Sequence, residues 1–503
     1  MNSLIVLNKN DNVGVSQFII PEKTKINGQE ISTIDPIPFG HKVCLKPINK
    51  GDPIIKYDQI IGFASKNISA GEHVHSHNLE FREFKRKFKI DEKKSLVNET
   101  SEKYFNGILR DNGEVATRNY IGIVSTVNCS ATVTKMIVEK LKHSNLLRDY
   151  PNIDGIVPIT HSTGCGMGVG EGNVGMQILK RTIDGFKNHP NFSHVFCIGL
   201  GCESAEISMF EKSLKKHERI YFLTIQNEGG TRKIVDKVYS QIKNLLDDAN
   251  KVTRSPQSVN NLVLALQCGG SDGYSGITAN PALGVAADLL ISEGGSAILS
   301  ETPEIYGAEH LLINRAKNQK VAEKLIGRLE WWKHYTTINE STMDNNPGPG
   351  NKKGGLTTIL EKSLGAVAKG GKSVLNDVLL YSEPIKERGF NFMDSPGYDP
   401  VSVTGQVASG ANVICFTTGR GSCFGCKPVP SLKLSTNTEM FKRMEEDMDI
   451  NCGYIADGSK TVDDVGEEIL NLIIDTASGN KSKSEINGYG DEEFNPWQVG
   501  VVM

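Results

Sequence analysis

The stretch Tyr-Ile-Gly-Ile-Val-Ser-Thr-Val at residues 120–127 opens the part of the chain that decides the fold. Its β-branched residues predict a buried strand, and the spacing of apolar residues after it predicts a helix. The same alternation continues along the chain, with helices expected at 131–142, 176–186 and 231–246 and strands at 155–160, 194–200 and 220–225. Repeated strand–helix units are typical of a parallel sheet with helices on its faces, so we expect an α/β fold.

A second run of the same kind lies nearer the C-terminus. A polar stretch at 254–260 separates it from the first run. The second run has predicted strands at 262–266, 296–299 and 412–417, a helix at 281–293 and a long helical region at 308–335. We therefore expect two α/β domains with largely parallel sheets, one at 106–252 and one at 258–503.

The N-terminal part of the chain has a different pattern. Residues 1–80 contain short strand-like segments, such as 42–45 and 59–63, separated by Gly, Asp and Pro. This pattern predicts a small β-rich domain. Residues 81–105 are strongly charged, include Lys85-Arg86-Lys87 and contain few aliphatic side chains, so we interpret them as a linker.

Composition narrows the class of protein. The chain has 503 residues, a net charge of −3 and 38% hydrophobic residues, which is ordinary for a globular protein. There is no basic excess to suggest nucleic acid, and no run of about 18 apolar residues to suggest a membrane span. The first residues lack the features of a secretion signal, so we expect a cytoplasmic protein acting on a small molecule, with a homo-oligomer possible.

Reactive side chains gather where the predicted strands end. In open α/β sheets, ligands bind beyond the carboxyl ends of the strands, so these residues are candidates for one shared site. A single cysteine after a strand is more often a small buried residue, as we expect for Cys44, Cys197 and Cys415 inside strands. The candidate residues at the strand ends are Cys129, His161, Cys165, Cys202, Glu203, Cys268, Glu301 and Arg420.

The residue types at these ends favour a metal. Thiolates with imidazole and carboxylate suit iron or zinc better than magnesium. The four candidate thiols, with Glu203 as a further ligand, could converge on one metal ion or on an iron–sulfur cluster. The wide spacing of these cysteines is less specific than a paired Cys-x-x-Cys motif. The chain has one such pair, Cys423 and Cys426, and no second pair to complete a zinc ribbon.

A separate group of imidazoles lies in the N-terminal region. His73, His75 and His77 alternate along the chain, so in a strand all three would share one face. Three histidines on one face are a plausible metal site, with His75 and His77 as our candidate ligands. A solvated hairpin edge explains the same pattern equally well.

Several motifs together resemble the altronate/galactarate dehydratase family. The similarity runs nearly from end to end and includes an N-terminal β domain of the SAF type, echoed by Gly40-His41-Lys42. The motifs are Gly-Leu-Gly-Cys-Glu at 199–203, Cys-Gly-Gly-Ser-Asp at 268–272, Thr-Ala-Asn-Pro at 278–281, Pro-Gly-Asn-Lys at 349–352, Lys-Ser-Leu-Gly at 362–365 and Thr-Gly-Arg-Gly at 418–421.

This resemblance implies an iron(II)-dependent hydro-lyase that forms a 2-keto-3-deoxy sugar acid, and an iron–sulfur cluster stays open as an alternative. Residues 73–78 and 303–309 look like the altronate branch, whereas 352–356 and 448–451 look like the galactarate branch. Residues 422–426 depart from the Thr-Pro-Tyr-Gly that we expect there, which leaves the substrate open. Within the motifs, the candidate substrate-binding residues are Ser271, Asn280, Asn351 and Lys352.

The chemistry of dehydration suggests roles for the remaining candidates. Loss of the proton beside a carboxylate builds up negative charge, which a divalent metal can stabilise. Arg420 could clamp a carboxylate, and His161 could act as base or acid. Glu203, Asp272 and Glu301 are alternative acids or bases, or metal ligands. Two rival functions remain at this point: a sulfolactate sulfo-lyase, and a sugar-acid binding protein without catalysis.

Overall fold

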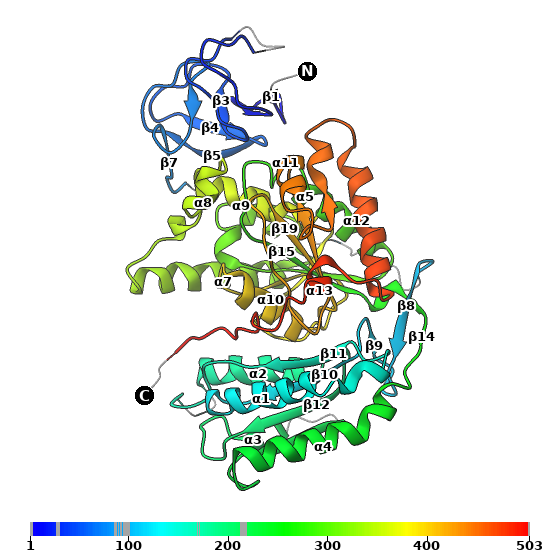
Figure 1. The fold of residues 1–503 in the computed structure, drawn as a ribbon. Helices are drawn as coiled ribbons and strands as arrows, with labels where there is room; N and C mark the ends of the chain where they lie inside the picture. The colour runs from blue at the N-terminus through cyan, green and yellow to red at the C-terminus, as the bar shows by residue number, and fades with distance from the viewer. Residues whose placement is uncertain are drawn as a thin grey trace.

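A computed structural model describes residues 4–26, 31–84, 88, 90, 93, 101–168, 170, 172–211 and 219–500. The blue N-terminal region lies at one end of the molecule and the cyan-to-green second domain at the other, with the C-terminal domain between them (Figure 1). The predicted α/β class with a small β-rich N-terminal region is confirmed. Lys85-Arg86-Lys87 of the predicted linker lies outside the described residues.

The N-terminal region contains two small antiparallel sheets. Short strands separated by turns give it a compact apolar interior, which includes Val13, Ile54 and Ile61. One sheet has the order β1-β2-β3-β6 and the other β4-β5-β7. The strands are β1 (Leu4–Ile5), β2 (Val13–Ser16), β3 (Lys42–Cys44), β4 (Pro53–Lys56), β5 (Gln59–Ala64), β6 (His73–Val74) and β7 (Leu79–Glu80).

The second domain is a parallel sheet with the strand order β11-β10-β12-β13. Every residue of β10 is buried, which explains why its sequence is continuously apolar rather than alternating. The strands are β10 (Tyr120–Ser125), β11 (Gly155–Ile159), β12 (Phe192–Gly199) and β13 (Ile220–Thr224). The helices are α1 (Asn128–His143), α2 (Val174–Lys187), α3 (Ile207–Glu211) and α4 (Thr231–Ala249).

A three-stranded antiparallel sheet joins the two α/β domains. It consists of β8 (Tyr104–Leu109), β9 (Val115–Ala116) and β14 (Arg254–Ser258), in the order β14-β8-β9. The polar stretch expected to be a spacer thus forms strand β14. Its backbone pairs with β8 from Arg254 opposite Ile108 to Ser258 opposite Tyr104, and this pairing leaves no signal in local hydrophobicity.

The C-terminal domain has a seven-stranded sheet with the order β17-β18-β16-β15-β19-β20-β21, in which every pairing is parallel. The strands are β15 (Val263–Cys268), β16 (Ser296–Leu299), β17 (Leu375–Leu379), β18 (Gly389–Met393), β19 (Val413–Thr418), β20 (Ser431–Ser435) and β21 (Ile450–Asn451). The helices are α5 (Ala279–Ser292), α6 (Glu309–Ile313), α7 (Gln319–Ile338), α8 (Pro349–Lys353), α9 (Ile359–Ala368), α10 (Asp399–Ala408), α11 (Thr438–Arg443), α12 (Val462–Ala477) and α13 (Lys483–Ile486).

The long helical region predicted at 308–335 is two helices, α6 and α7. Asn318 ends the connection between them, because its side chain accepts a hydrogen bond from the backbone N–H of Val321 and starts α7. None of the described helices combines the length and apolar character needed to span a bilayer.

The C-terminal domain shares apolar core with both neighbours. One cluster joins Val13 and Ile61 of the N-terminal region to Leu264 of β15, and another joins Ile183 of α2 to Val407 of α10. Buried ion pairs also join the N-terminal region to the C-terminal domain. The carboxylate of Glu361 in α9 forms ion pairs with Lys42 Nζ at 2.8 Å and with Lys56 Nζ at 3.0 Å. All three side chains are at most 1% exposed. The N-terminal region is therefore anchored beside α9.

Candidate active site

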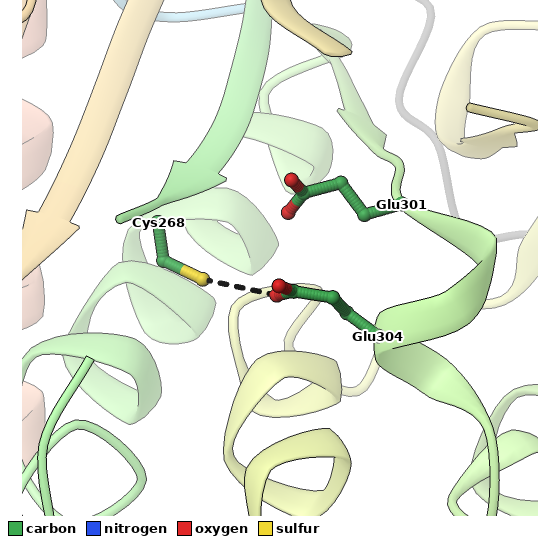
Figure 2. Close-up of side chains that lie close together, drawn as sticks. All are labelled: Cys268, Glu301 and Glu304. Atoms are coloured by element: carbon green, nitrogen blue, oxygen red, sulfur yellow. Dashed lines mark hydrogen bonds between the residues drawn. The ribbon is translucent and has the colours of Figure 1, made fainter. Parts of the chain in front are cut away.

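A thiol and two carboxylates meet beyond the carboxyl ends of β15 and β16. Cys268 is the last residue of β15, and Glu301 and Glu304 come from the segment that follows β16. One ligand atom of each lies within 4.8 Å of the others, and the Cys268 Sγ is 3.7 Å from Glu304 Oε2 (Figure 2). Within the described part of the chain, no other three His, Cys, Asp or Glu side chains meet this closely.

Glu301 is held in an unusual state. Its φ is 72°, in the left-handed region that residues with a side chain rarely adopt, and its backbone N–H donates to Ser395 Oγ at 3.0 Å. Both carboxylate oxygens are buried without a hydrogen-bond partner. Burial, together with the charge of Glu304, raises the pKa of Glu301 well above its usual value. An unpaired buried carboxylate is costly, so this one is arranged for a proton or for a cation.

Two lysines from α9 and its end complete the cluster. Lys362 Nζ lies 2.5 Å from Glu304 Oε1, and Lys369 Nζ lies 2.8 Å from Cys268 Sγ. Burial raises the pKa of the Cys268 thiol to about 11, although Lys369 opposes this shift. Burial also acts to raise the pKa of Glu304, but the two lysines outweigh it and keep that pKa below its usual value. The site is therefore rich in buried charge of both signs.

One side of the cluster reaches toward solvent. Asn346, whose Nδ2 donates to Glu304 Oε1 at 2.8 Å, is half-buried, and so is Asp399 at the start of α10. Burial and the nearby Glu304 raise the pKa of Asp399 to about 6. A Cβ on Gly269 would lie 2.1 Å from Asp399 Oδ2, so only glycine lets Asp399 approach the end of β15.

The donor set fits the class of metal that the sequence indicated. A thiol with two carboxylates suits iron or zinc, whereas magnesium prefers oxygen ligands alone. The two orphaned oxygens of Glu301 supply free lone pairs in the middle of this set. Cys268 and Glu301 were predicted from the strand ends. Glu304 and Lys362 lie inside quoted motifs but were not singled out, and no signal in the sequence marked Lys369.

Other predicted residues of the C-terminal domain surround the same sheet edge. Ser271 and Asp272 are buried, and Asn351 Nδ2 donates to the Ser271 carbonyl at 2.9 Å. Asn280 links α5 to α9 and β19, because its Nδ2 donates to the Gly365 carbonyl at 2.8 Å and its Oδ1 accepts from Thr417 Oγ1 at 2.6 Å.

Asp272 and Arg420 differ in how much freedom they have. Asp272 accepts hydrogen bonds from Thr436 Oγ1 at 2.9 Å and Asn437 Nδ2 at 3.2 Å, while burial raises its pKa against these bonds. Arg420 has an exposed side chain, and its backbone N–H donates to the Gly270 carbonyl at 3.0 Å. Arg420 is therefore free to meet an anion, whereas Asp272 already has several donors.

The histidines of the N-terminal region pack against α8. His75 Nε2 lies 2.9 Å from the Lys352 carbonyl, and His41 Nε2 lies 3.2 Å from the Lys353 carbonyl. The His41 and His73 rings are also linked, with Nδ1 and Nε2 3.0 Å apart, and the His73 and His77 ring centroids are 5.4 Å apart. The contacts of His75 and His41 with α8 make these two residues part of a domain contact, in which His41 was not predicted.

The predicted residues of the second domain do not join this cluster. Cys129, Cys165 and Cys202 follow β10, β11 and β12, in a different sheet from Cys268. No three of the four thiols lie within 4.8 Å of one another, so the expected convergence of all four on one ion is not found. The physical reason is that the strand ends belong to two separate sheets, which the sequence pattern could not distinguish.

His161 and Glu203 are occupied by the backbone of their own domain. His161 Nε2 lies 3.0 Å from the Ser125 carbonyl and its Nδ1 accepts from the Thr163 N–H at 3.3 Å, while burial lowers its pKa to about 4. Glu203 accepts from the N–H groups of Leu200 at 3.0 Å and Gly201 at 2.6 Å. This geometry does not support His161 as the base, because both ring nitrogens are engaged.

The parallel sheets place this protein in the α/β class, with a buried group of ionisable side chains at the strand ends, where such proteins bind ligands. Three family models match the chain in order: "Altronate/galactarate dehydratase SAF domain" at residues 2–82, "D-galactarate dehydratase/Altronate hydrolase, second domain" at 107–250, and "D-galactarate/Altronate dehydratase, C-terminal" at 259–502. The chain belongs to the altronate/galactarate dehydratase family, a family of hydro-lyases. The resemblance expected from the motifs is confirmed.

Individual relatives are similar over nearly the whole chain. Altronate dehydratase of Bacillus subtilis (strain 168) is 34% identical over 516 residues, which covers 100% of both chains. Altronate dehydratase of Escherichia coli (strain K12) is 32% identical and covers 98% of both. Galactarate dehydratase (L-threo-forming) of the same strain is 37% identical over 90% of this chain and 88% of its own length.

Proposed function

We propose that this chain removes water from a sugar acid of the altronate or galactarate kind and forms a 2-keto-3-deoxy sugar acid. The end-to-end similarity to relatives with those names supports the substrate class. We assign the reaction to this site because the buried Glu301 carboxylate has no hydrogen-bond partner and lies beside Cys268 and Glu304.

The reaction needs both proton transfer and positive charge. Removal of the proton beside the substrate carboxylate leaves an electron-rich intermediate, and departure of the neighbouring hydroxyl requires a proton donor. Lys362 and Lys369 bring two positive charges into the cluster. The raised pKa of Glu301 favours its neutral form until a cation binds beside it.

Iron(II) is the cofactor that we assign to this cluster. Cys268, Glu301 and Glu304 would hold it, and when bound it would supply Lewis-acid stabilisation of the negative charge. Lys362 keeps Glu304 oriented, because its Nζ contacts both Glu304 Oε1 at 2.5 Å and Asn346 Oδ1 at 2.8 Å. Arg420, exposed at the same sheet edge, is our candidate for binding the distal carboxyl or a hydroxyl of the substrate.

Turnover of purified protein on three acids tests this proposal. The protein is loaded with ferrous iron under reducing conditions and incubated with altronate, galactarate or sulfolactate, and 2-keto acid and sulfite are measured. We expect 2-keto acid from one of the sugar acids, loss of activity after chelation and recovery with ferrous iron. Sulfite release would instead support sulfo-lyase activity, for which a (2R)-sulfolactate sulfo-lyase subunit beta is a 27% identical relative over 76% of this chain.

Two further outcomes would contradict the assignment. Full turnover in chelator-treated, metal-free protein would exclude metal assistance. Tight binding of a sugar acid without turnover under all these conditions would favour a binding protein on the same scaffold.

A further inference from the structure

The exposed cysteines of this chain are unevenly distributed. Cysteine is among the residue types most often buried, and an exposed free thiol is a liability through oxidation. The exposed cysteines are Cys129, Cys165, Cys202 and Cys423. The first three all lie in the second domain, in the segments that follow three adjacent strands of one sheet. This grouping suggests that the three thiols share a ligand.

These three cysteines come from neighbouring positions at the carboxyl end of one sheet. The strand order β11-β10-β12 places Cys129, after β10, between Cys165, after β11, and Cys202, after β12. Their loops are hydrogen-bonded to one another: the Asn128 N–H donates to the Thr163 carbonyl at 2.8 Å, and the Ala205 N–H donates to the Gly164 carbonyl at 3.0 Å. The three cysteines therefore come from segments in direct contact, Cys129 from the start of α1 and the other two from loops.

The loops are shaped for this close approach. Gly164 has a φ of +101°, and a Cβ there would lie 2.8 Å from the Thr126 carbonyl oxygen, so glycine is required. Gly201, next to Cys202, has a φ of +125°. Glu203 caps the turn around Gly201, and His161 ties the loop before Cys165 to the end of β10. Glu203 and His161 have no role in the proposed dehydration, and they stabilise the loops next to the cysteines.

Two of the three cysteines lie next to a helix N-terminus or a hydrogen-bond donor. Cys129 is the second residue of α1, a helix whose N-cap, Val127, gives no side-chain hydrogen bond and whose first turn has no acidic residue. The N-terminus of a helix carries a partial positive charge. Gln226 adds a donor, with its Nε2 3.5 Å from Cys202 Sγ.

We propose that Cys129, Cys165 and Cys202 hold a four-iron, four-sulfide cluster through three thiolates. A single tetrahedral ion with metal–sulfur bonds of about 2.3 Å would draw three thiolates to within about 3.8 Å of one another. The three Sγ atoms do not all lie within 4.8 Å of one another, which argues against a single ion, whereas in a cluster each thiolate binds a different iron atom. The fourth iron has no thiolate from this set and is open to an oxygen ligand. This cysteine site is separate from the site formed by Cys268, Glu301 and Glu304.

The test is the iron and acid-labile sulfide content of full-length protein made and purified without oxygen. We expect about four sulfides per chain, with matching iron beyond that held at Cys268, and the visible absorption of an iron–sulfur cluster. Cys129→Ser, Cys165→Ser and Cys202→Ser should each lose most of the sulfide. Cys423→Ser removes the remaining exposed thiol and should keep it all.

Alkylation of the intact protein covers the case in which a serine variant fails to fold. In wild-type protein the three thiols should resist alkylation until the cluster is stripped, while Cys423 reacts at once. Protein without sulfide after reconstitution, zinc in place of iron, or equal loss in Cys423→Ser would overturn the proposal. Sulfide-free protein that still dehydrates a sugar acid would overturn the cluster alone, and cluster-containing protein without dehydratase activity would overturn only the proposed function.

Discussion

At the scale of single residues, Glu301 combines a strained backbone with an unsatisfied side-chain carboxylate. Its backbone is in the left-handed region and its carboxylate is buried without a partner, and each of these costs free energy. Such a combination persists only when the surrounding packing imposes it. The Ser395 hydroxyl and the end of β16 hold the backbone, so the carboxylate cannot turn away to solvent.

Glu301→Gln separates the function of this carboxylate from its stability cost. The amide has the same shape but cannot ionise, so kcat/KM should fall by about 100-fold or more. The melting temperature of metal-free protein should stay about the same, because the raised pKa already favours a neutral carboxyl group and the amide has the same shape. Glu467→Gln, on an exposed face of α12, is the matched control and should change neither quantity. Full activity together with a lower melting temperature would show that Glu301 is structural.

His189 predicts a pH dependence of stability. It is buried at the contact between the second and C-terminal domains, with Nε2 3.0 Å from the Ala411 carbonyl, and burial lowers its pKa from 6.5 to about 4. The unfolded chain therefore binds a proton that the folded chain does not. Stability from this group is fully present above pH 6.5 and is lost as the pH falls toward 4.

The check is the urea midpoint at pH 7 and at pH 5. The midpoint should fall on acidification in the wild-type protein and fall less in His189→Gln, which keeps a donor but cannot be protonated. His143→Gln changes an exposed histidine and should follow the wild type. Equal falls in all three proteins would exclude His189 as a source of the pH dependence.

At the scale of elements, the position of α9 determines where the two lysines of the site lie. Helix α9 begins at Thr358, whose side chain accepts from the Glu361 N–H and donates to the Ile61 carbonyl. Its other end lies against α5, where a Cβ on Gly284 would lie 2.3 Å from the Ala368 carbonyl oxygen. The close approach of α5 and α9 at this glycine is what places Lys369 against Cys268.

Gly284→Ala should push these two helices apart. Because the clash is with backbone, we expect a loss of about 1–3 kcal/mol in the free energy of unfolding. We also expect lower kcat/KM, since Lys369 moves with the end of α9. Gly327→Ala is the same change in helix α7 where nothing lies within 4 Å, and it should stabilise by about 0.4–1 kcal/mol. Equal effects of the two changes in denaturant titrations would contradict this account.

At the scale of the whole molecule, the N-terminal region is fastened to the C-terminal domain by a buried charge group. Lys42 and Lys56 both reach Glu361, one helical residue before Lys362 of the site. Lys42 Nζ also donates to the Gly355 carbonyl at 2.6 Å. Docking of the N-terminal region and placement of Lys362 therefore depend on the same turn of α9.

Glu361→Gln should loosen this docking. It leaves two buried ammonium groups without a counter-charge, for which we expect a loss of about 3–5 kcal/mol. Limited proteolysis should then release the N-terminal region earlier than in wild-type protein. Asp248→Asn breaks the exposed pair with Lys251 and should cost less than about 1 kcal/mol. Unchanged proteolysis of Glu361→Gln would show that apolar packing alone holds the region.

Local sequence patterns are enough to predict the α/β class and the end of the sheet where the reactive residues lie. Strands such as β10 and β15 are marked by local apolar runs, and parallel strands carry their functional residues at their carboxyl ends. Cys268 and Glu301 could be found for that reason. Strand β14 could not, because its polar residues form a strand only by pairing with β8.

Which of these residues come into contact depends on how the elements pack, and local sequence does not show it. Cys129 and Cys268 follow strands that look alike in sequence, yet the strands belong to different sheets. Lys369 has no local mark, and it enters the site because α5 and α9 pack closely enough to bury it against the Cys268 thiol. Local sequence encodes the elements, whereas contacts between residues far apart in the chain depend on how those elements pack.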